Sequence, residues 1–167
     1  SLPSLYNYHF DQGSQTYNFI TKNSVEYKIA FIVDETFSAV SGLEINNIYQ
    51  MIIEKVSDKI EKFDSLVSLT IKNIVRAFFE NSENAMIYIC NNSDRKAISR
   101  FNTFERWYWS SEMTDYISKV DNIIKCDLPD NQVQIIYTSL LFHKNNSNKE
   151  TILEVYNTIE EILNSDK

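Results

Sequence analysis

Three of the chain's four arginines lie close together, at positions 95, 100 and 106. A guanidinium group is planar and always charged, and it forms paired hydrogen bonds with a carboxylate or a phosphate. Asp94 and Arg95 stand at the predicted start of a helix, where backbone N–H groups favour an anion. This start follows a strand predicted at residues 85–90, and the carboxyl ends of strands in open sheets often bind ligands. We therefore predict an anion-binding site made of Asp94, Arg95, Arg100 and Arg106.

A simpler interpretation of the same segment needs no ligand. Ser93 or Asp94 can be an ordinary helix N-cap, which contributes about 1 kcal/mol by itself. One face of the predicted helix carries residues at helical spacing: Arg95, Ser99, Asn102, Arg106 and Trp109. Such a face can be solvated, with its arginines paired to carboxylates of this acidic chain. The sequence favours this interpretation over the ligand site.

The elements that position these residues form the middle of the chain. Residues 85–90 contain no charged side chain, which predicts a central strand covered on both faces. The segment from about Arg95 to Trp109 predicts a helix with one apolar face. That face is formed by Ile98, Phe101, Phe104 and Tyr108. We expect it to pack into the core.

The chain lacks the motifs of many enzymes and cofactor-binding proteins. Gly13 and Gly42 are its two glycines, and a phosphate-binding loop needs several. Its two histidines, His9 and His143, lie on distant segments, which disfavours a zinc site. The sequence therefore predicts no catalytic residues, no metal site and no cofactor, and it favours a protein that is not an enzyme.

The first part of the chain alternates apolar and polar residues in three segments. Residues 6–10, 17–21 and 27–33 predict three antiparallel strands joined by short turns. Residues 41–44 match the capping box that opens a helix. Apolar residues then recur at helical spacing, so we predict a first helix over residues 45–60.

The second part predicts two further helices and a hairpin. Asp64 or Ser65 is expected to cap a helix that runs to Phe78. Residues 122–126 and 133–142 predict a hairpin around a proline turn. Residues 147–150 match another capping box, before a last amphipathic helix. The predicted order is β-β-β-α-α-β-α-β-β-α. It indicates one α+β domain over residues 1–167, with helices packed on a mixed, mostly antiparallel sheet.

The composition restricts the partners. The net charge is -7 over 167 residues, and such a surface repels nucleic acid and anionic lipid. No segment is apolar for long enough to cross a bilayer, and no charged-then-apolar secretion signal opens the sequence. Cys90 and Cys126 lie in apolar segments and are predicted to be reduced, buried thiols. We expect a cytoplasmic protein that binds neither nucleic acid nor membranes.

A pattern of aromatic and polar residues resembles that of a known family. The positions are Tyr17, Phe19, Thr21, Glu26, Tyr27, Ile29, Phe31, Thr70, Ile71, Phe78, Phe79, Tyr88, Ile89, Cys90, Asp94, Arg100, Phe104 and Trp107. From about Tyr6 to the last helix, the chain is similar to a domain-of-unknown-function family of short stand-alone proteins from Bacteroidota-type bacteria. The resemblance implies a stand-alone, cytoplasmic bacterial protein and supplies neither a mechanism nor catalytic residues.

Three functional hypotheses follow. The first is a binding, interaction or regulatory protein, with a protein partner or a homodimer contact through an exposed aromatic surface at Trp107 and Trp109. The second is a small-ligand-binding protein or enzyme with an anion site at the end of the 85–90 strand. The third is an antitoxin-like protein that masks a basic partner. The missing catalytic set favours the first hypothesis.

Overall fold

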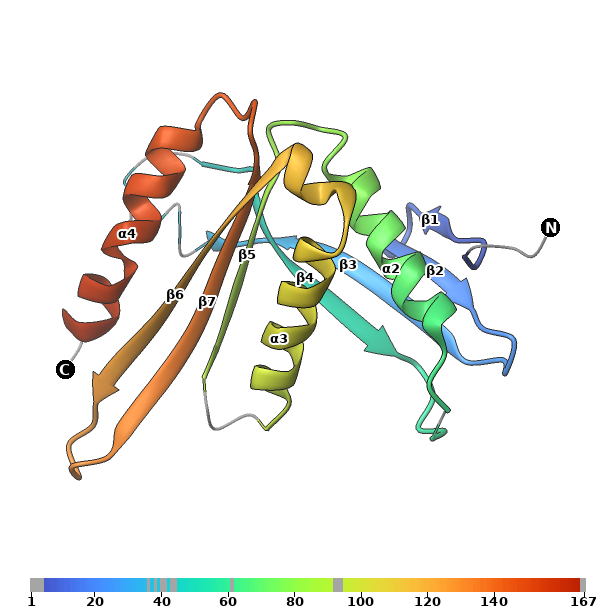
Figure 1. The fold of residues 1–167 in the computed structure, drawn as a ribbon, viewed down its shortest axis with the longest axis horizontal. Coiled ribbons are helices and arrows are strands. Elements are labelled where there is room, and N and C mark those ends of the chain that lie inside the picture. Colours follow the sequence, from blue (N-terminus) through green and yellow to red (C-terminus); the bar gives the residue numbers. More distant parts are fainter. Residues whose placement is uncertain are drawn as a thin grey trace.

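The computed structural model describes residues 5–35, 37, 39, 42, 45–60, 62–91 and 95–165, without the side chains of residues 95, 97, 160 and 162–165. Seven strands form one mixed sheet in the order β1-β2-β3-β4-β5-β7-β6 (Figure 1). They are β1 (His9–Asp11), β2 (Thr16–Ile20), β3 (Glu26–Val33), β4 (Ile48–Lys55), β5 (Ala85–Asn91), β6 (Ile117–Asp127) and β7 (Val133–His143). Among the pairings of these described strands, that of β4 with β5 is parallel and the others are antiparallel. The predicted α+β class with a mostly antiparallel sheet is confirmed.

Helices cover both faces of this sheet. The described helices are α2 (Ser65–Phe78), α3 (Arg95–Trp109), α4 (Lys149–Ser165) and the short 3₁₀ helix η1 (Glu112–Asp115). Asp64 caps α2, since its Oδ1 accepts the N–H of Leu66 at 3.0 Å, and α3 has the predicted bounds. The capping box predicted for the last helix is wrong, because the N–H of Ser147 donates to Oε1 of Glu83 at 3.2 Å rather than to Glu150, and α4 begins at Lys149.

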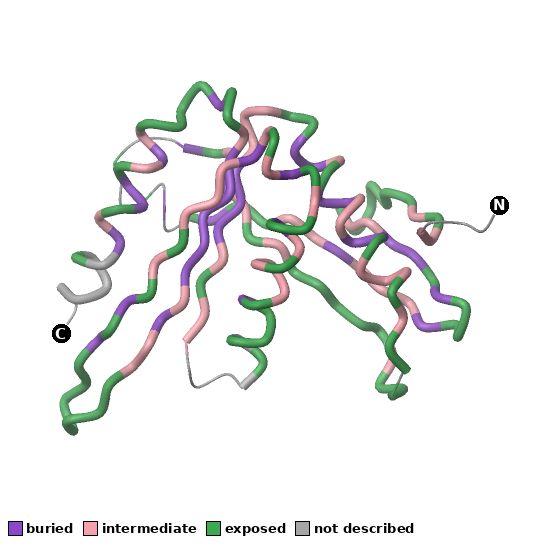
Figure 2. The backbone as a smooth tube through the Cα atoms, viewed as in Figure 1, coloured by how far each residue is buried: buried purple, intermediate pink, exposed green. Residues whose placement is uncertain are grey.

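Side chains that alternate along the central strands build two cores. Ala85 and Ile87 pack toward α4, whereas Met86 packs with α2 and with Tyr108 of α3. Buried residues are concentrated along β5 and β7, near the centre of the molecule (Figure 2). The predicted central strand is confirmed as β5, which lies between β4 and β7. Toward the end of β5 the strand is not fully covered, because Ile89 is 37% exposed.

The helix predicted over residues 45–60 is wrong, because this segment contains β4. The strand pairs antiparallel with β3, with Met51 opposite Phe31 and Ile53 opposite Ile29. Isoleucine and tyrosine favour a strand, and the backbone groups on this side of β3 need a partner. The capping box at residues 41–44 lies outside the described residues, apart from Gly42.

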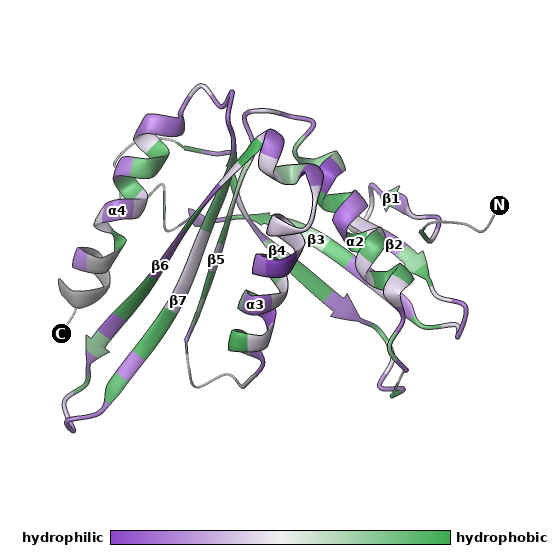
Figure 3. Ribbon diagram, viewed as in Figure 1, coloured by the Kyte–Doolittle hydropathy of each residue, from purple (hydrophilic) through white to green (hydrophobic). Residues whose placement is uncertain are grey.

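The sheet forks between β4 and β5. These strands pair only at Ile48 with Ala85 and at Tyr49 with Met86, and they then diverge (Figure 1). Each strand continues along its other neighbour, β4 along β3 and β5 along β7. Helix α3, which is mostly hydrophilic in Figure 3, runs beside the opening. At the fork, α3 therefore lies next to β4, and beyond Tyr49 this side of β4 pairs with no other strand that the structure describes.

Candidate functional site

A hollow of about 310 Å³ lies at the fork of the sheet. We call it the fork groove. One wall comes from β4, the other from α3, and Tyr88 of β5 contributes between them. Its lining residues are Met51, Ile52, Ile53, Tyr88, Ser99, Arg100, Thr103, Phe104 and Trp107. The groove exists because α3 packs over a point where two neighbouring strands separate.

The walls of the fork groove are largely apolar and aromatic. The ring of Phe104 lies between two others, with centroid distances of 5.7 Å to Tyr88 and 5.5 Å to Trp107. Arg100 is the charged residue among the described residues that line the groove. Apolar walls with a few polar groups are typical of ligand sites, and a guanidinium selects a carboxylate or phosphate. The groove thus fits a ligand with an apolar body and an acidic group.

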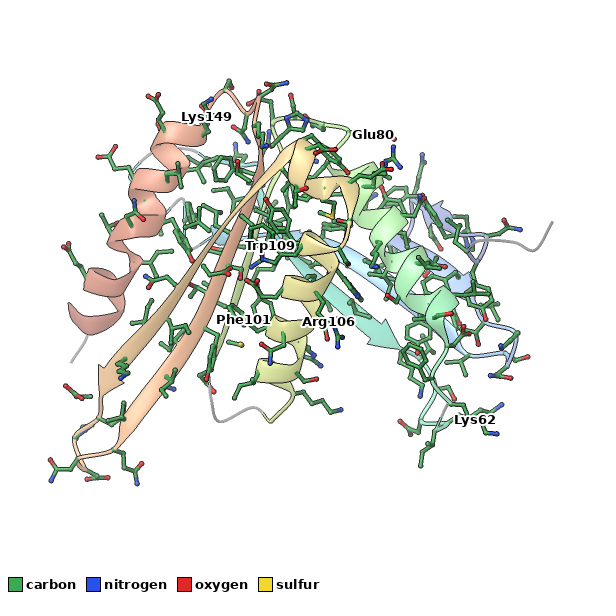
Figure 4. The ribbon with its side chains drawn as sticks, in the orientation of Figure 1. Lys62, Glu80, Phe101, Arg106, Trp109 and Lys149 are labelled. Carbon is green, nitrogen blue, oxygen red and sulfur yellow. The ribbon has the colours of Figure 1, made fainter. Side chains whose placement is uncertain are left out.

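The structure places the predicted anion-binding residues unequally. Arg100 lines the fork groove, whereas Asp94 and the side chain of Arg95 lie outside what the structure describes. Arg106 is exposed, and in the view of Figure 4 its label lies on the side of α3 toward β4, away from Phe101. Its Nη2 lies 3.4 Å from Oγ1 of the groove residue Thr103. Arg106 therefore flanks the groove, and the four-residue anion site stays a prediction.

The two predicted interface residues differ in environment. Trp109 is 71% exposed, and its Nε1 donates to Oε2 of Glu105 at 2.9 Å. Trp107 is half-buried and lines the fork groove. It also lines a second hollow of about 290 Å³, toward the start of α2. That hollow's other lining residues are Tyr27, Lys55, Lys62, Phe63, Asp64, Val67, Ser68 and Ile71. Trp107 therefore lines both hollows, and both lie along β4.

A network of charged side chains connects α3 to the sheet on the side of the helix away from the fork groove. The side chain of Lys119 on β6 is 2% exposed, and its Nζ donates to Glu105 of α3 and to Asp121 of β6. Ser139 on β7 donates to Oδ1 of Asp121 at 2.6 Å. Nζ of Lys119 also lies 5.5 Å from the ring centre of Phe101, a cation–π contact. These contacts hold one side of α3 while the other side borders the groove.

This network is absent from the sequence-based prediction. Ser139 is 1% exposed and Lys119 is almost fully covered, so a substrate cannot reach either group. We interpret the network as a structural connection. The one sequence signal is a pair of opposite charges two residues apart in a strand, Lys119 and Asp121. The predicted strand began at residue 122 and therefore excluded both.

Burial and hydrogen bonding act in opposite directions on Asp121. Burial raises the pKa of a carboxyl group. Here it is outweighed by hydrogen bonds from Lys119 and Ser139 and by the charge of Lys119, which together hold the pKa of Asp121 below its usual range. Asp121 is therefore a stabilising carboxylate at neutral pH.

Burial also raises the pKa of Tyr108, whose hydroxyl donates to the carbonyl of Ile117 at 2.7 Å.

Other sequence-based predictions concern metals, thiols and membranes. Within the described part of the chain, no three His, Cys, Asp or Glu side chains gather as metal ligands. Cys126 is buried as predicted, whereas Cys90 is only half-buried. None of the helices that the structure describes is long and apolar enough to span a membrane.

Comparisons with known proteins give a family. Neither the curated proteins nor the solved structures contain a match to the chain. Residues 63–158 match DUF6169, described as a family of unknown function. The match includes α3 and the charge network but leaves out β4, so it is narrower than the resemblance from Tyr6 onward. Because it spans more than half of the sequence, the chain belongs to this family of unknown function, DUF6169.

Proposed function

We propose that the protein is a binding protein whose partner presents an acidic group to the fork groove. The observation that carries the proposal is the combination of apolar walls from β4 and α3 with the guanidinium of Arg100. Apolar groups of the partner would gain affinity by packing against the aromatic rings of the groove, such as Phe104 and Trp107. An acidic group would gain selectivity from a charge-assisted hydrogen bond with Arg100.

The charge of α3 supports an acidic partner. Its sequence carries four basic residues and one acidic residue, although the chain as a whole has a net charge of -7. The acidic residue, Glu105, accepts a hydrogen bond from Lys119 on the side away from the groove. The groove therefore borders a locally basic surface, which attracts acidic partners and disfavours basic ones.

Replacing Arg100 by glutamate is expected to weaken binding of acidic ligands by at least about 30-fold, because losing a charged partner costs about 2 kcal/mol or more. The probe is a set of linear peptides selected from a random display library on the immobilised wild-type protein. We expect acidic peptides with large apolar residues to be enriched. Their dissociation constants are then measured by fluorescence anisotropy on both proteins.

The matched control is Arg76→Glu. Arg76 is exposed on α2 and lines a different hollow, with Met113 and Tyr116, so the same charge change is made away from the fork groove. This variant should keep the wild-type affinity within about threefold, because a distant exposed charge is largely screened. Selection of no acidic peptide, or equal binding to the wild type and to Arg100→Glu, would contradict the proposal.

Self-association is a second candidate function, supported by the 71% exposure of Trp109. An exposed tryptophan is a common anchor of protein contacts. If two copies meet through Trp109, light scattering at high concentration should give the mass of a dimer, and Trp109→Ala should shift it to that of a monomer. Trp107→Phe is a useful comparison, because it changes the groove and keeps Trp109. A monomeric wild type at high concentration would rule out this dimer.

A further inference from the structure

We infer that the partner is an extended peptide segment that adds to the sheet as a strand along the open edge of β4, with its acidic side chains directed at Arg100. This inference rests on the proposed function of the fork groove and specifies the partner.

The direction of the backbone groups along β4 is fixed by its pairing with β3. The N–H of Asp34 donates to the carbonyl of Ile48 at 2.7 Å, and the N–H of Val56 donates to the carbonyl of Glu26 at 2.9 Å. In an antiparallel pair, residues that exchange hydrogen bonds alternate with residues whose groups point the other way. The even-numbered residues of β4 therefore bond to β3. Met51, Ile53 and Lys55 point their N–H and C=O groups away from it.

Among the strands that the structure describes, none lies beside this outward edge beyond Tyr49. Its pairing with β5 ends at Tyr49 and Met86, and in the described part of the chain β4 has no sheet neighbours besides β3 and β5. Residues 51–55 extend over about 17 Å at the usual rise of a strand. An open row of backbone donors and acceptors is a template for another chain. A partner peptide in extended form would supply the missing hydrogen bonds.

The fork groove lies along this edge. Met51, Ile52 and Ile53 are successive residues, and their side chains alternate between the two faces of the sheet. A hollow lined by all three therefore borders the edge of the strand, which is where an added strand would lie. The second hollow continues past Trp107 to Lys55, so the space follows β4 toward its end.

The charges along the two hollows suit an acidic peptide. Arg100 lies at the fork, and Lys55 and Lys62 line the second hollow. Asp64 is the acidic residue among the described lining residues, and it is engaged by the hydroxyl of Tyr6 and by the N–H of Leu66. A β4 edge from a second copy would bring its own Arg100, Lys55 and Lys62 to these hollows and so add positive charge to positive charge. We therefore assign the edge to an acidic segment of another protein.

The decisive variant is Ile53→Pro, tested with the selected acidic peptides. Proline removes the N–H that points out of the edge and leaves the bonds to β3, which come from the neighbouring residues; such positions tolerate proline. We expect at least about tenfold weaker binding than to the wild type. Ile53→Val is the matched control, because it keeps the N–H and a β-branched side chain, and its affinity should stay within about threefold.

A second measurement uses the unaltered protein. N-methylation of every second amide of a peptide should weaken binding at least about tenfold in one of the two registers, the one whose amides face β4. Methylation in the other register should have a much smaller effect.

The outcomes separate this inference from the function on which it rests. If Arg100→Glu loses binding while Ile53→Pro and both methylated peptides bind normally, strand addition is overturned and the groove remains the site. If Arg100→Glu binds as the wild type does, the proposed function fails as well. Equal loss in both methylation registers would also overturn strand addition, since a strand presents alternate amides to its neighbour.

Discussion

Replacing Lys119 by alanine is expected to lower the free energy of unfolding by about 3 kcal/mol. The ammonium group is almost fully buried and satisfies carboxylates on two elements, Glu105 of α3 and Asp121 of β6. Without it, two partly buried negative charges face each other with no cation between them, and the ring of Phe101 loses its cation. Urea unfolding followed by circular dichroism measures the change.

The matched control for this variant is Lys125→Ala on the same strand. Lys125 is exposed, so its loss should change the free energy of unfolding by no more than about 0.5 kcal/mol. An equal loss in the two variants would contradict the assigned role of the network.

Acid provides a second measurement on Lys119→Ala. The pKa of Asp121 is lower in the folded protein than in the unfolded chain, where it is about 3.9. Its contribution to stability is therefore complete above that value and is lost as the pH falls through the folded pKa. Wild type should lose more stability than the variant between neutral pH and about pH 3. Parallel pH profiles would show that Lys119 does not stabilise this carboxylate.

Local sequence signals predicted the elements that carry their own information. The start of α2 was predicted at Asp64 or Ser65 because both residue types cap a nearby N–H, and the structure shows Asp64 in this role. Helix α3 was predicted because its aromatic residues recur at helical spacing. Strand β5 was predicted because residues 85–90 form an apolar run, and its first residues are buried on both faces. In each case the residues that decide the structure are neighbours in the sequence.

The prediction for residues 45–60 was wrong because the spacing of their apolar residues fits both the period of a helix and that of a strand. Ile48, Ile52 and Ile53 are spaced for a helical stripe, yet a run of isoleucines is equally suitable for a strand. Pairing with β3 decides between them, and that pairing depends on residues 29–33, which are distant in sequence. A capping-box match at residues 41–44 then favoured the helix on local grounds alone.

The same reason limits how much of the site could be predicted. Arg100 was identified as a possible contact for an anion, and the structure places it in a hollow. The other wall of that hollow is β4, which the sequence-based prediction made a helix. The fork arises from the end of a strand pairing, and the charge network joins α3 to β6 and β7. The fork has no local sequence pattern, and the local pair Lys119 and Asp121 does not reveal the partners of the network on α3 and β7.

Replacing Ile48 by alanine is expected to lower the free energy of unfolding by roughly 3 to 4 kcal/mol. Ile48 is 0% exposed and packs in the core beneath α4, next to the point where β4 and β5 separate. Truncation removes buried methyl and methylene groups and leaves a cavity at the apex of the fork. The surrounding strands hold this site from both sides, so it cannot easily collapse. Urea unfolding of the variant gives the value.

Ile52→Ala is the matched control, and the comparison tests the strand assignment itself. In β4, Ile48 and Ile52 are the same residue type on the same face of the same strand, but Ile52 lies past the fork and is 45% exposed. Its truncation should cost less than about 1 kcal/mol. In a helix over residues 45–60 the two would lie one turn apart on a single apolar stripe, and both truncations would be costly. Similar losses for the two variants would therefore contradict both the strand and the fork that creates the groove.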